Sequence, residues 1–506
     1  MSLLYKKLIK IKSQSIFEKN AIITSDESKI NYQALIQKIN FLSNNIKNTT
    51  KANNFLILLE NSIEAIILIF AISKNNGGTV ILDYDIKKDQ IEKIIKDTNC
   101  FNLITDLSKK KIFSVYKLKN VKIHFIENLL KKKIKKKNNF SLKKKLKSKY
   151  FLTSFSSGST GEPKPIRYTE KCKFLRSVQS KKLFNIKTND KIICYTPIHH
   201  SLALRITFLS LINHTTLIFM KKFNFFKFTE LVSKYKVSVI FPISSHLEIM
   251  YNFIKKPEIL KNLNIVVASS ANASISLKKK LYSLLKNRFV EIYGLSEMAI
   301  VSILRFSDVK LGYLRSVGKI VPGVKVKIAN LNGQKKNDDK KGNILCRSPY
   351  MSGFEKNEID DKKIFNENYL NTGDLGSFKK KWLFFEGRDK DIIIRSGVNI
   401  YPKIIENVLS KEILLTNVMV IAGNDQYFGE APIAICEIKK NKSKNQLEKK
   451  LIKLVNQKLP KVYHPAGYFF EKKLKVSKMG KVNKQYYTNK YKDKLKNNIS
   501  KIFKSL

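Results

Sequence analysis

A glycine- and hydroxyl-rich segment in the first third of the chain has the residue types needed to hold phosphate groups. Its members are Ser156, Ser157, Gly158, Ser159, Thr160, Gly161 and Lys164. Glycines let the backbone approach an anion closely, hydroxyls donate hydrogen bonds, and the lysine supplies a positive charge. The apolar run at 150–153 is typical of a strand that leads into a loop. The segment predicts a nucleotide phosphate site, and its alternative is a solvated Ser/Gly linker.

Two short motifs further along the chain carry carboxylates directly after turns. In the run 293–297, Gly294 permits a tight turn, Ser296 could donate to a phosphate oxygen, and Glu297 could hold a hard cation. In the run 369–376, Asp374 follows a Thr-Gly turn and could accept hydrogen bonds from both hydroxyls of a ribose. Either motif alone is equally compatible with an ordinary turn.

The last quarter of the chain adds two more candidate loops. Gly387 and Arg388 precede an apolar strand and a glycine loop that ends at Pro402, and the alternative is a linker followed by a hairpin. Lys481 follows Gly480 in a short polar loop, which by itself means little in a chain this rich in lysine.

The order and spacing of these motifs together resemble the acyl-adenylate-forming superfamily, which includes acyl- and aryl-CoA synthetases, adenylation domains and luciferases. The resemblance covers nearly the whole chain, and the type most like it is an acyl-CoA synthetase. The matching runs are 156–164, 293–297, 372–374, 387–388, 397–402 and 480–481, with weaker matches at 59–64 and 77–83.

The resemblance implies a role for each motif in the binding of ATP and Mg²⁺. The 156–164 loop would close over the β- and γ-phosphates. Tyr293, beside Gly294, would lie against the adenine. Ser296 would touch the α-phosphate and Glu297 would bind Mg²⁺.

The remaining roles concern the ribose, the reacting carboxylate and the thiol acceptor. Asp374, aided by Arg388, would hold the ribose hydroxyls, and Lys481 would bridge the attacking carboxylate and the α-phosphate. His200 would gate the passage between the ATP and acyl sites. Lys390 would be the hinge about which the small domain turns. That rotation would bring the Gly397 loop to the pantetheine tunnel.

The elements that must position these residues alternate between strands and helices. Strands are expected at 53–60, 79–82, 192–195, 216–219, 237–240, 265–268 and 289–293, and helices at 62–73 and 90–97. This rhythm predicts an α/β fold with a large N-terminal domain of αβ-sandwich subdomains over 1–386. The turn-rich stretch 318–385 indicates a small β-rich subdomain within it. A hinge at 387–390 then joins a mobile, small α+β domain over 391–506, and a lysine-rich surface connection lies near 131–149.

The charge of the chain is unusual for an enzyme of 506 residues. It has 97 Lys and Arg against 40 Asp and Glu, a net charge of +57. A coding bias that favours Lys, Ile and Asn explains this, and the alternative is a surface for polyanions such as an anionic membrane. No groove- or base-reading motif accompanies the charge, so no specific nucleic-acid partner is expected. Five scattered cysteines and the absence of a signal-peptide core favour a cytoplasmic protein.

The expected reaction joins a carboxylic acid to ATP, releases pyrophosphate, and passes the acyl group to coenzyme A. A fatty or other simple organic acid is the preferred substrate, because Ser201 follows the gate histidine where amino-acid and aryl-acid members carry Asp or Asn. One alternative is a stand-alone adenylation enzyme that loads the phosphopantetheine of an acyl carrier protein. Another is an inactive scaffold that binds polyanions through its charge.

Overall fold

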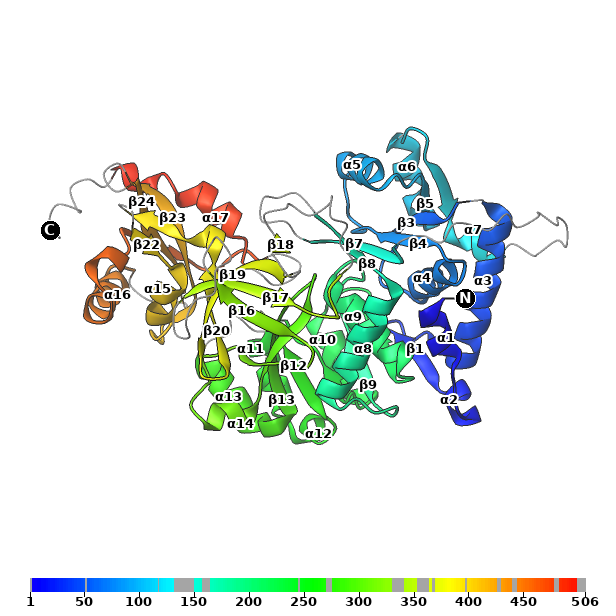
Figure 1. Ribbon diagram of the computed structural model, residues 1–506, viewed down its shortest axis with the longest axis horizontal. Helices are drawn as coiled ribbons and strands as arrows, with labels where there is room; N and C mark the ends of the chain where they lie inside the picture. Colours follow the sequence, from blue (N-terminus) through cyan, green and yellow to red (C-terminus); the bar gives the residue numbers. More distant parts are fainter. Residues whose placement is uncertain are drawn as a thin grey trace.

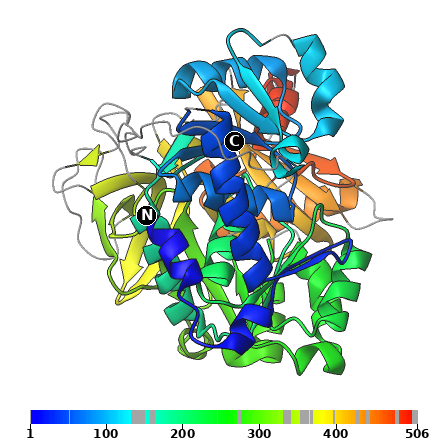
Figure 2. The same cartoon turned by 90° about the vertical axis from the view of Figure 1, so that its right-hand side faces the viewer.

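The described part of the chain forms three β-sheets with covering helices, and Figure 1 shows the N-terminal part on the right and the C-terminal part on the left. The computed structural model describes residues 2–50, 52–116, 118–131, 150–156, 164–243, 246–269, 275–329, 341–352, 364–365, 369–395, 398–425, 429–438, 444–476 and 482–497. In the view of Figure 2 the six-stranded sheet lies above the central part, and the C-terminal part lies behind. The lysine-rich stretch 132–149 and the chain end 498–506 are outside the described residues.

The six-stranded sheet has the order β6-β5-β3-β4-β7-β8 and is parallel except for β8. Its strands are β3 (Asn54–Leu58), β4 (Gly78–Ile81), β5 (Asn102–Thr105), β6 (Lys122–Phe125), β7 (Leu152–Ser156) and β8 (Lys164–Tyr168). Its helices are α3 (Tyr32–Thr49), α4 (Ile63–Lys74), α5 (Lys88–Thr98), α6 (Lys110–Tyr116) and α7 (Ile126–Lys131). The predicted strands and helices of this region are confirmed, with boundaries shifted by one or two residues at most ends.

Helix α4 shows why this part of the chain folds as the sequence indicates. The Ser62 hydroxyl accepts a hydrogen bond from the backbone N–H of Ala65 and so caps the helix. Every residue from Ala65 to Ser73 is buried, so the helix is surrounded by protein on all sides. The apolar segment from Ala65 to Ile72 is therefore part of a core helix, where the sequence predicts a helix at 62–73.

The central sheet changes from parallel to antiparallel at the hairpin between β13 and β14. On its parallel side, β12, β11, β9, β10 and β1 follow β13, with β2 antiparallel at the edge. The strands are β1 (Asn20–Thr24), β2 (Lys29–Asn31), β9 (Lys191–Cys194), β10 (Thr216–Phe219), β11 (Val239–Ile240), β12 (Ile265–Ala268), β13 (Phe289–Leu295), β14 (Ala299–Leu304), β15 (Gly318–Ile320), β16 (Lys325–Ala329), β17 (Gly342–Arg347), β18 (Ile364–Phe365), β19 (Tyr369–Lys379) and β20 (Trp382–Arg388). The expected β-rich subdomain corresponds to β15–β20, and its strands continue the same hydrogen-bonded sheet.

Helices cover the central sheet and fill the space between it and the six-stranded sheet. They are α8 (Glu170–Phe184), α9 (Ser201–Ile212), α10 (Phe225–Lys234), α11 (Leu247–Ile254), α12 (Pro257–Leu260), α13 (Ile275–Leu285) and α14 (Phe306–Lys310), with α1 (Leu3–Ile9) and α2 (Gln14–Glu18) at the N-terminus. Helix α8 is exceptional because its buried face is mostly polar, with Lys173, Arg176 and Gln179 among its buried side chains. Arg176 and Gln179 donate to the backbone of neighbouring segments, and the Lys173 ammonium lies over the ring of Tyr168, 3.5 Å from its centroid.

The C-terminal part is a small α+β unit with its own hydrophobic core. Its sheet contains β21 (Ile393–Arg395), β22 (Val398–Ile400), β23 (Leu415–Asp425), β24 (Gly429–Ile438) and β25 (Gly467–Glu471), and its helices are α15 (Pro402–Leu409), α16 (Lys444–Lys458) and α17 (Lys484–Tyr491). Ile405, Val420 and Leu451 belong to a buried cluster that is separate from the cores of the preceding sheets. The predicted fold class is confirmed.

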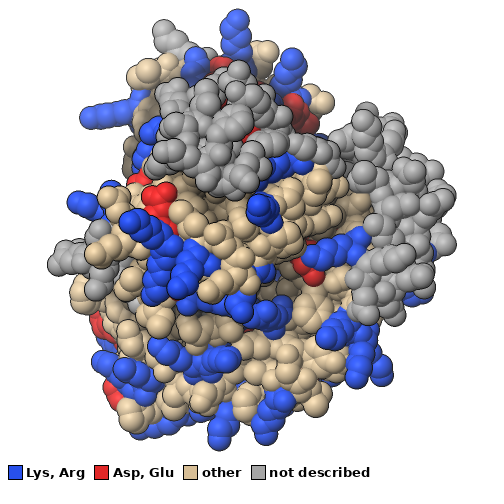
Figure 3. Space-filling model, turned by 90° about the vertical axis from the view of Figure 1, so that its left-hand side faces the viewer, with Lys and Arg blue, Asp and Glu red and all other residues tan. Residues whose placement is uncertain are grey.

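The surface and the cysteines bear on the sequence-based interpretation of charge and redox state. On the face shown in Figure 3, Lys and Arg side chains lie in several groups separated by uncharged surface, and acidic side chains are few. All five cysteines are buried and none forms a disulfide. None of the helices that the structure describes has both the length and the apolar character needed to cross a lipid bilayer.

Candidate active site

The Tyr-Gly-Leu-Ser-Glu motif forms the tight hairpin between β13 and β14, at the carboxyl end of the last parallel strand. The N–H of Met298 donates to the carbonyl of Leu295 at 3.2 Å, which closes the turn. A side chain at Gly294 would place its Cβ 2.0 Å from the carbonyl oxygen of Ala299, so only glycine fits there. The hairpin therefore fixes the backbone from which Tyr293, Ser296 and Glu297 project.

Tyr293 and Asp374, from separate motifs, meet in the interior. The Tyr293 hydroxyl donates to Oδ2 of Asp374 at 2.8 Å. The Arg388 guanidinium Nε lies 3.4 Å from Oδ1 of the same carboxylate, because Asp374 and Arg388 are cross-strand partners on β19 and β20. Three residues that the sequence predicts for the adenosine site are thus brought together.

The turn before Asp374 is set by its own hydrogen bonds. The Thr372 hydroxyl donates to the carbonyl of Ile344 at 2.8 Å and accepts from the N–H of Asp374 at 3.1 Å. Gly373 has φ +71°, a left-handed conformation that costs glycine little. This geometry presents the Asp374 carboxylate at a defined position on β19.

Electrostatics in this cluster keep the tyrosine neutral. Burial, followed by the negative charge of Asp374, raises the pKa of Tyr293 well above its usual value. The phenol therefore remains a hydrogen-bond donor throughout the physiological range. Arg388 is about half exposed, with 48% of its side chain accessible, and its other donors remain available to a ligand.

Ser296 and His200 lie near each other through α9. The hydroxyls of Ser201 and Ser296 are 2.8 Å apart, so the first residue of α9 contacts the hairpin directly. His200 is the N-cap residue of α9, and its ring centroid lies 4.0 Å from that of His199. The predicted gate histidine is thus one residue from a side chain that contacts a predicted catalytic residue.

An asparagine that the sequence analysis did not single out organises the segment before His200. The Asn61 amide donates to the carbonyls of Thr196 and Met220, each at 2.9 Å. Its Oδ1 accepts from the N–H of Ile198 at 2.7 Å. Asn61 therefore joins the end of β3 to the loops after β9 and β10. Its signals in the sequence were its place just after an apolar strand and the weak family match at 59–64.

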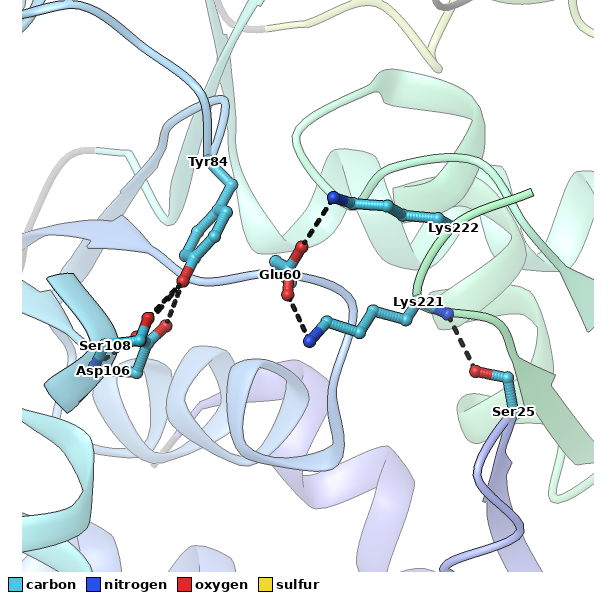
Figure 4. A network of polar contacts seen from close by, with 7 residues as sticks. All are labelled: Ser25, Glu60, Tyr84, Asp106, Ser108, Lys221 and Lys222. Atoms are coloured by element: carbon cyan, nitrogen blue, oxygen red, sulfur yellow. Dashed lines mark hydrogen bonds and ion pairs between the residues drawn. The ribbon is translucent and has the colours of Figure 1, made fainter. Parts of the chain in front are cut away.

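Figure 4 shows polar contacts at the carboxyl ends of the parallel strands, one set between the six-stranded and central sheets and one within the six-stranded sheet. Glu60 pairs with Lys221 at 2.6 Å and with Lys222 at 3.5 Å, across the loops that follow β3 and β10. Tyr84 donates to Asp106 at 3.0 Å, linking the loops after β4 and β5. Ligand sites of parallel α/β sheets lie at this edge, so the ties brace the region in which the predicted residues gather.

Several predicted residues lie wholly or partly outside the described part of the chain. The residues Ser157, Gly158, Ser159, Thr160, Gly161, Gly397 and Lys481 are not described. The backbones of Ser156 and Lys164, on either side of residues 157–163, are paired as the last residue of β7 and the first residue of β8. Lys390 lies in the exposed 3-10 turn Asp389–Asp391, where partial desolvation lowers its pKa and Asp391 opposes the shift.

The donor set suits ATP with a phosphate-bound Mg²⁺. Among the described residues, no group of three or more His, Cys, Asp or Glu side chains is gathered that could cage a metal by itself. Mg²⁺ in nucleotide sites is commonly held by one or two carboxylates together with substrate phosphates, and Glu297 can supply one carboxylate. The chemistry of the residues therefore fits the implied metal.

Comparison with known proteins identifies the family. The model of the AMP-binding enzyme family matches residues 13–353, and the model of the AMP-binding enzyme C-terminal domain matches residues 404–481. A 2-succinylbenzoate–CoA ligase of Oceanobacillus iheyensis is 24% identical over 454 residues, which cover 88% of this chain and 92% of that protein.

Solved structures of the same fold cover almost the whole chain. The ATP-bound crystal structure of MatB from Rhodopseudomonas palustris has a TM-score of 0.86 at 19% identity and covers 98% of this chain and 100% of that one. The o-succinylbenzoate CoA synthetase MenE of Bacillus subtilis, with its acyl-adenylate intermediate, has a TM-score of 0.81 at 20% identity and covers 96% and 98%. The chain therefore belongs to the AMP-binding enzyme family, as an acid–thiol ligase of the AMP-forming acyl-CoA synthetase type.

Proposed function

We propose that the chain activates an aryl carboxylic acid with ATP and transfers the acyl group to coenzyme A. The observation that carries the activation step is the junction of Tyr293, Asp374 and Arg388 beside the β13–β14 hairpin. It combines an aromatic ring, a carboxylate and an exposed cation in the arrangement that an adenosine ligand needs. The family membership supports the same assignment.

Each residue of the site has a role that follows from its chemistry. Asp374 accepts hydrogen bonds from the ribose hydroxyls, and Arg388 adds donors from its exposed side. Ser296 donates to the α-phosphate, and Glu297 holds Mg²⁺, which when bound offsets the charge of the phosphates. Lys481, which is outside the described residues, would supply a cation that lowers the repulsion between the attacking carboxylate and the α-phosphate at the transition state.

The first half-reaction needs no general base. A carboxylate oxygen attacks the α-phosphorus, the bond to the bridging oxygen breaks, and pyrophosphate leaves with the electron pair. Carboxylates are already ionised at neutral pH, so positioning and charge compensation supply the acceleration. In the second half-reaction the thiolate of coenzyme A attacks the acyl carbonyl and AMP leaves.

The relatives favour an aryl acid over the fatty or simple organic acid that the sequence alone suggested. The Oceanobacillus relative is named for 2-succinylbenzoate, and the MenE structure contains an o-succinylbenzoyl adenylate. Neither supports a place for this chain in fatty-acid metabolism. We therefore propose an aromatic acid as the substrate class, with a second carboxylate on the substrate as a candidate feature.

Acid-dependent exchange between ATP and pyrophosphate tests the activation step. Purified protein is incubated with Mg²⁺, ATP and labelled pyrophosphate, and with benzoate, 2-succinylbenzoate, malonate, hexanoate or palmitate. We expect exchange with at least one aryl acid and capture of its adenylate by hydroxylamine. Exchange with aliphatic acids alone would show that the substrate is not an aryl acid. The absence of exchange with every acid would overturn the proposed activation step.

The acceptor is decided by a second assay on the best acid. Coenzyme A and a phosphopantetheinylated carrier protein are offered in parallel, and thioester formation is followed by mass spectrometry. The CoA ligase names of the relatives favour coenzyme A. Loading of the carrier protein alone would instead support a stand-alone adenylation enzyme.

The two half-reactions need two arrangements of the small domain, and we place the hinge at 387–390. Arg388 ends β20, and Lys390 lies in the exposed turn between the central sheet and β21. Rotation there would withdraw the Lys481 loop and bring the Gly397 loop to the thiol. A hinge of a few residues between elements is a common way to alternate two chemistries at one site.

A further inference from the structure

A buried arginine on α8 holds the backbone of the Ser296–Glu297 turn. The guanidinium of Arg176 donates through Nη1 to the carbonyl of Ser296 at 2.8 Å and through Nη2 to the carbonyl of Glu297 at 2.7 Å. Its Nε donates to the carbonyl of Tyr350 at 2.8 Å. One side chain thus satisfies three carbonyl oxygens from two separate segments.

This arginine pairs with backbone carbonyls, and the groups around it include further cations. Arg176 is only 4% exposed, and no ion pair to it is found among the described residues. Lys173 and Arg205 are nearby buried or partly buried cations, and each has its pKa lowered by burial first and then by the charge of Arg176. Among the described residues, the guanidinium of Arg176 is therefore stabilised by its three carbonyl acceptors, and the Lys173 ammonium lies 3.5 Å from the ring centroid of Tyr168.

The turn that Arg176 holds carries two of the residues assigned to ATP and Mg²⁺. The carbonyl of Ser296 also accepts from the Tyr168 hydroxyl at 3.3 Å, and that of Glu297 from the N–H of Ser352 at 2.8 Å. With their carbonyls engaged on one side, these two peptides have little freedom to rotate. Rotation of a peptide moves the side chains on either side of it, so the bonds restrict where the Ser296 hydroxyl and the Glu297 carboxylate can lie.

We propose that Arg176 is a positioning residue for adenylation, which fixes the Ser296–Glu297 turn for Mg²⁺–ATP. It touches neither the substrate nor the metal, and it acts through the two peptides that it binds. The planar guanidinium suits this task because its donors lie in a fixed fork, whereas a lysine ammonium cannot reach three carbonyls from two segments at once. The inference rests on the proposed function, since it assigns the turn to the nucleotide.

Two variants at this position separate geometry from charge. Arg176→Lys keeps a cation but loses the fork, and Arg176→Met removes both. The matched control is Gln179→Met, because Gln179 is buried on the same helix and donates to the carbonyl of Ile300 at 3.2 Å, on β14 beyond the turn. All three variants are first checked for folding by circular dichroism and thermal unfolding.

The first readout is kinetic. We expect both Arg176 variants to lower kcat for ATP–pyrophosphate exchange by roughly 100-fold, the effect of a misplacement of about 1 Å in a catalytic group. The Mg²⁺ concentration for half-maximal exchange rises several-fold, while KM for the acid changes little. Gln179→Met changes neither value beyond about twofold. Full rescue by Arg176→Lys, or an unchanged Mg²⁺ dependence in Arg176→Met, would overturn the proposal.

The second readout does not depend on activity. Amide hydrogen exchange is measured by mass spectrometry on the ligand-free protein, over peptides that cover 293–300. We expect faster exchange in both Arg176 variants and wild-type rates in Gln179→Met. If the wild type shows no pyrophosphate exchange, the proposed function fails, whereas unchanged hydrogen exchange in the Arg176 variants defeats the positioning role on its own.

Discussion

The hydroxyl of Tyr293 donates a 2.8 Å hydrogen bond to the carboxylate of Asp374, 81 positions away in the chain. One residue comes from the last parallel strand of the central sheet, and the other from an antiparallel strand beyond the β13–β14 hairpin. The bond joins Tyr293, which is proposed to contact the adenine, to Asp374, which is proposed to bind the ribose. It engages Oδ2 of the Asp374 carboxylate, whereas Arg388 pairs with Oδ1.

Removing this bond should weaken ATP binding more than it weakens folding. In Tyr293→Phe the ring remains, and the carboxylate loses one of two partners. We expect KM for ATP to rise by about tenfold, which corresponds to roughly 1.4 kcal/mol for a hydrogen bond to a charged group. KM for the acid should stay within about twofold.

A matched control for that variant is Tyr282→Phe. Tyr282 is equally buried and donates to the carbonyl of Leu304 at 2.9 Å, on β14 outside the proposed site. It should lose similar stability and keep the wild-type KM for ATP. Equal rises in KM for both variants would show that the effect is structural and not local to the nucleotide.

Lys481 should matter for the first half-reaction only. We expect Lys481→Ala to lower the rate of acid-dependent pyrophosphate exchange by at least about 100-fold, because the charge repulsion at the transition state is no longer offset. Thioester formation from a synthetic acyl adenylate should continue at close to the wild-type rate. Lys473→Ala, at an exposed position on the same part of the chain, is the control and should leave both rates unchanged.

A substitution at the hinge should impair thioester formation and spare adenylation, the reverse of the result expected for Lys481→Ala. Proline fixes φ near −65°, so Lys390→Pro should hold the small domain in one arrangement. We expect pyrophosphate exchange to persist while thioester formation falls by on the order of 100-fold, as judged by single-turnover assays. Lys390→Ala, which keeps backbone freedom, should support both steps, and equal loss in both variants would argue against a hinge.

Stability should depend on pH through His246. Burial lowers the pKa of this histidine to about 4, and its ring is stacked on Phe223 with centroids 3.9 Å apart. The unfolded chain protonates His246 near pH 6.5, so it binds more protons than the folded chain between about pH 6.5 and 4. Stability from the neutral ring is complete above pH 6.5 and is lost as the pH falls through this window.

The variant His246→Phe isolates that contribution, because all other titrating groups are shared with the wild type. Unfolding midpoints are measured for both proteins between pH 7.5 and pH 4.5. We expect the free energy of unfolding of the variant to rise relative to that of the wild type as the pH falls, by on the order of 2 kcal/mol in total. A difference that stays constant with pH would contradict the assigned pKa shift.

Much of the fold could be predicted because local patterns dominated it. The polar cap at Ser62 and the continuous apolar run after it specify α4, and short apolar runs bounded by turn residues specify β3, β4, β10 and β12. The change from parallel to antiparallel order at the β13–β14 hairpin was less visible. Strand direction and neighbours depend on packing between distant segments, which periodicity does not encode.

The sequence by itself determined the motif set and hence the family, because the order and spacing of short motifs such as 293–297 and 372–374 are properties of the chain alone. Only the tertiary structure decided which of them touch and what holds them. The contacts of Tyr293 with Asp374, of Ser201 with Ser296, and of Arg176 with the hairpin join residues 81, 95 and 120 positions apart. Such contacts arise from the order of strands in a sheet and from the burial of a polar helix face. A single sequence read by local pattern carries no direct signal of either.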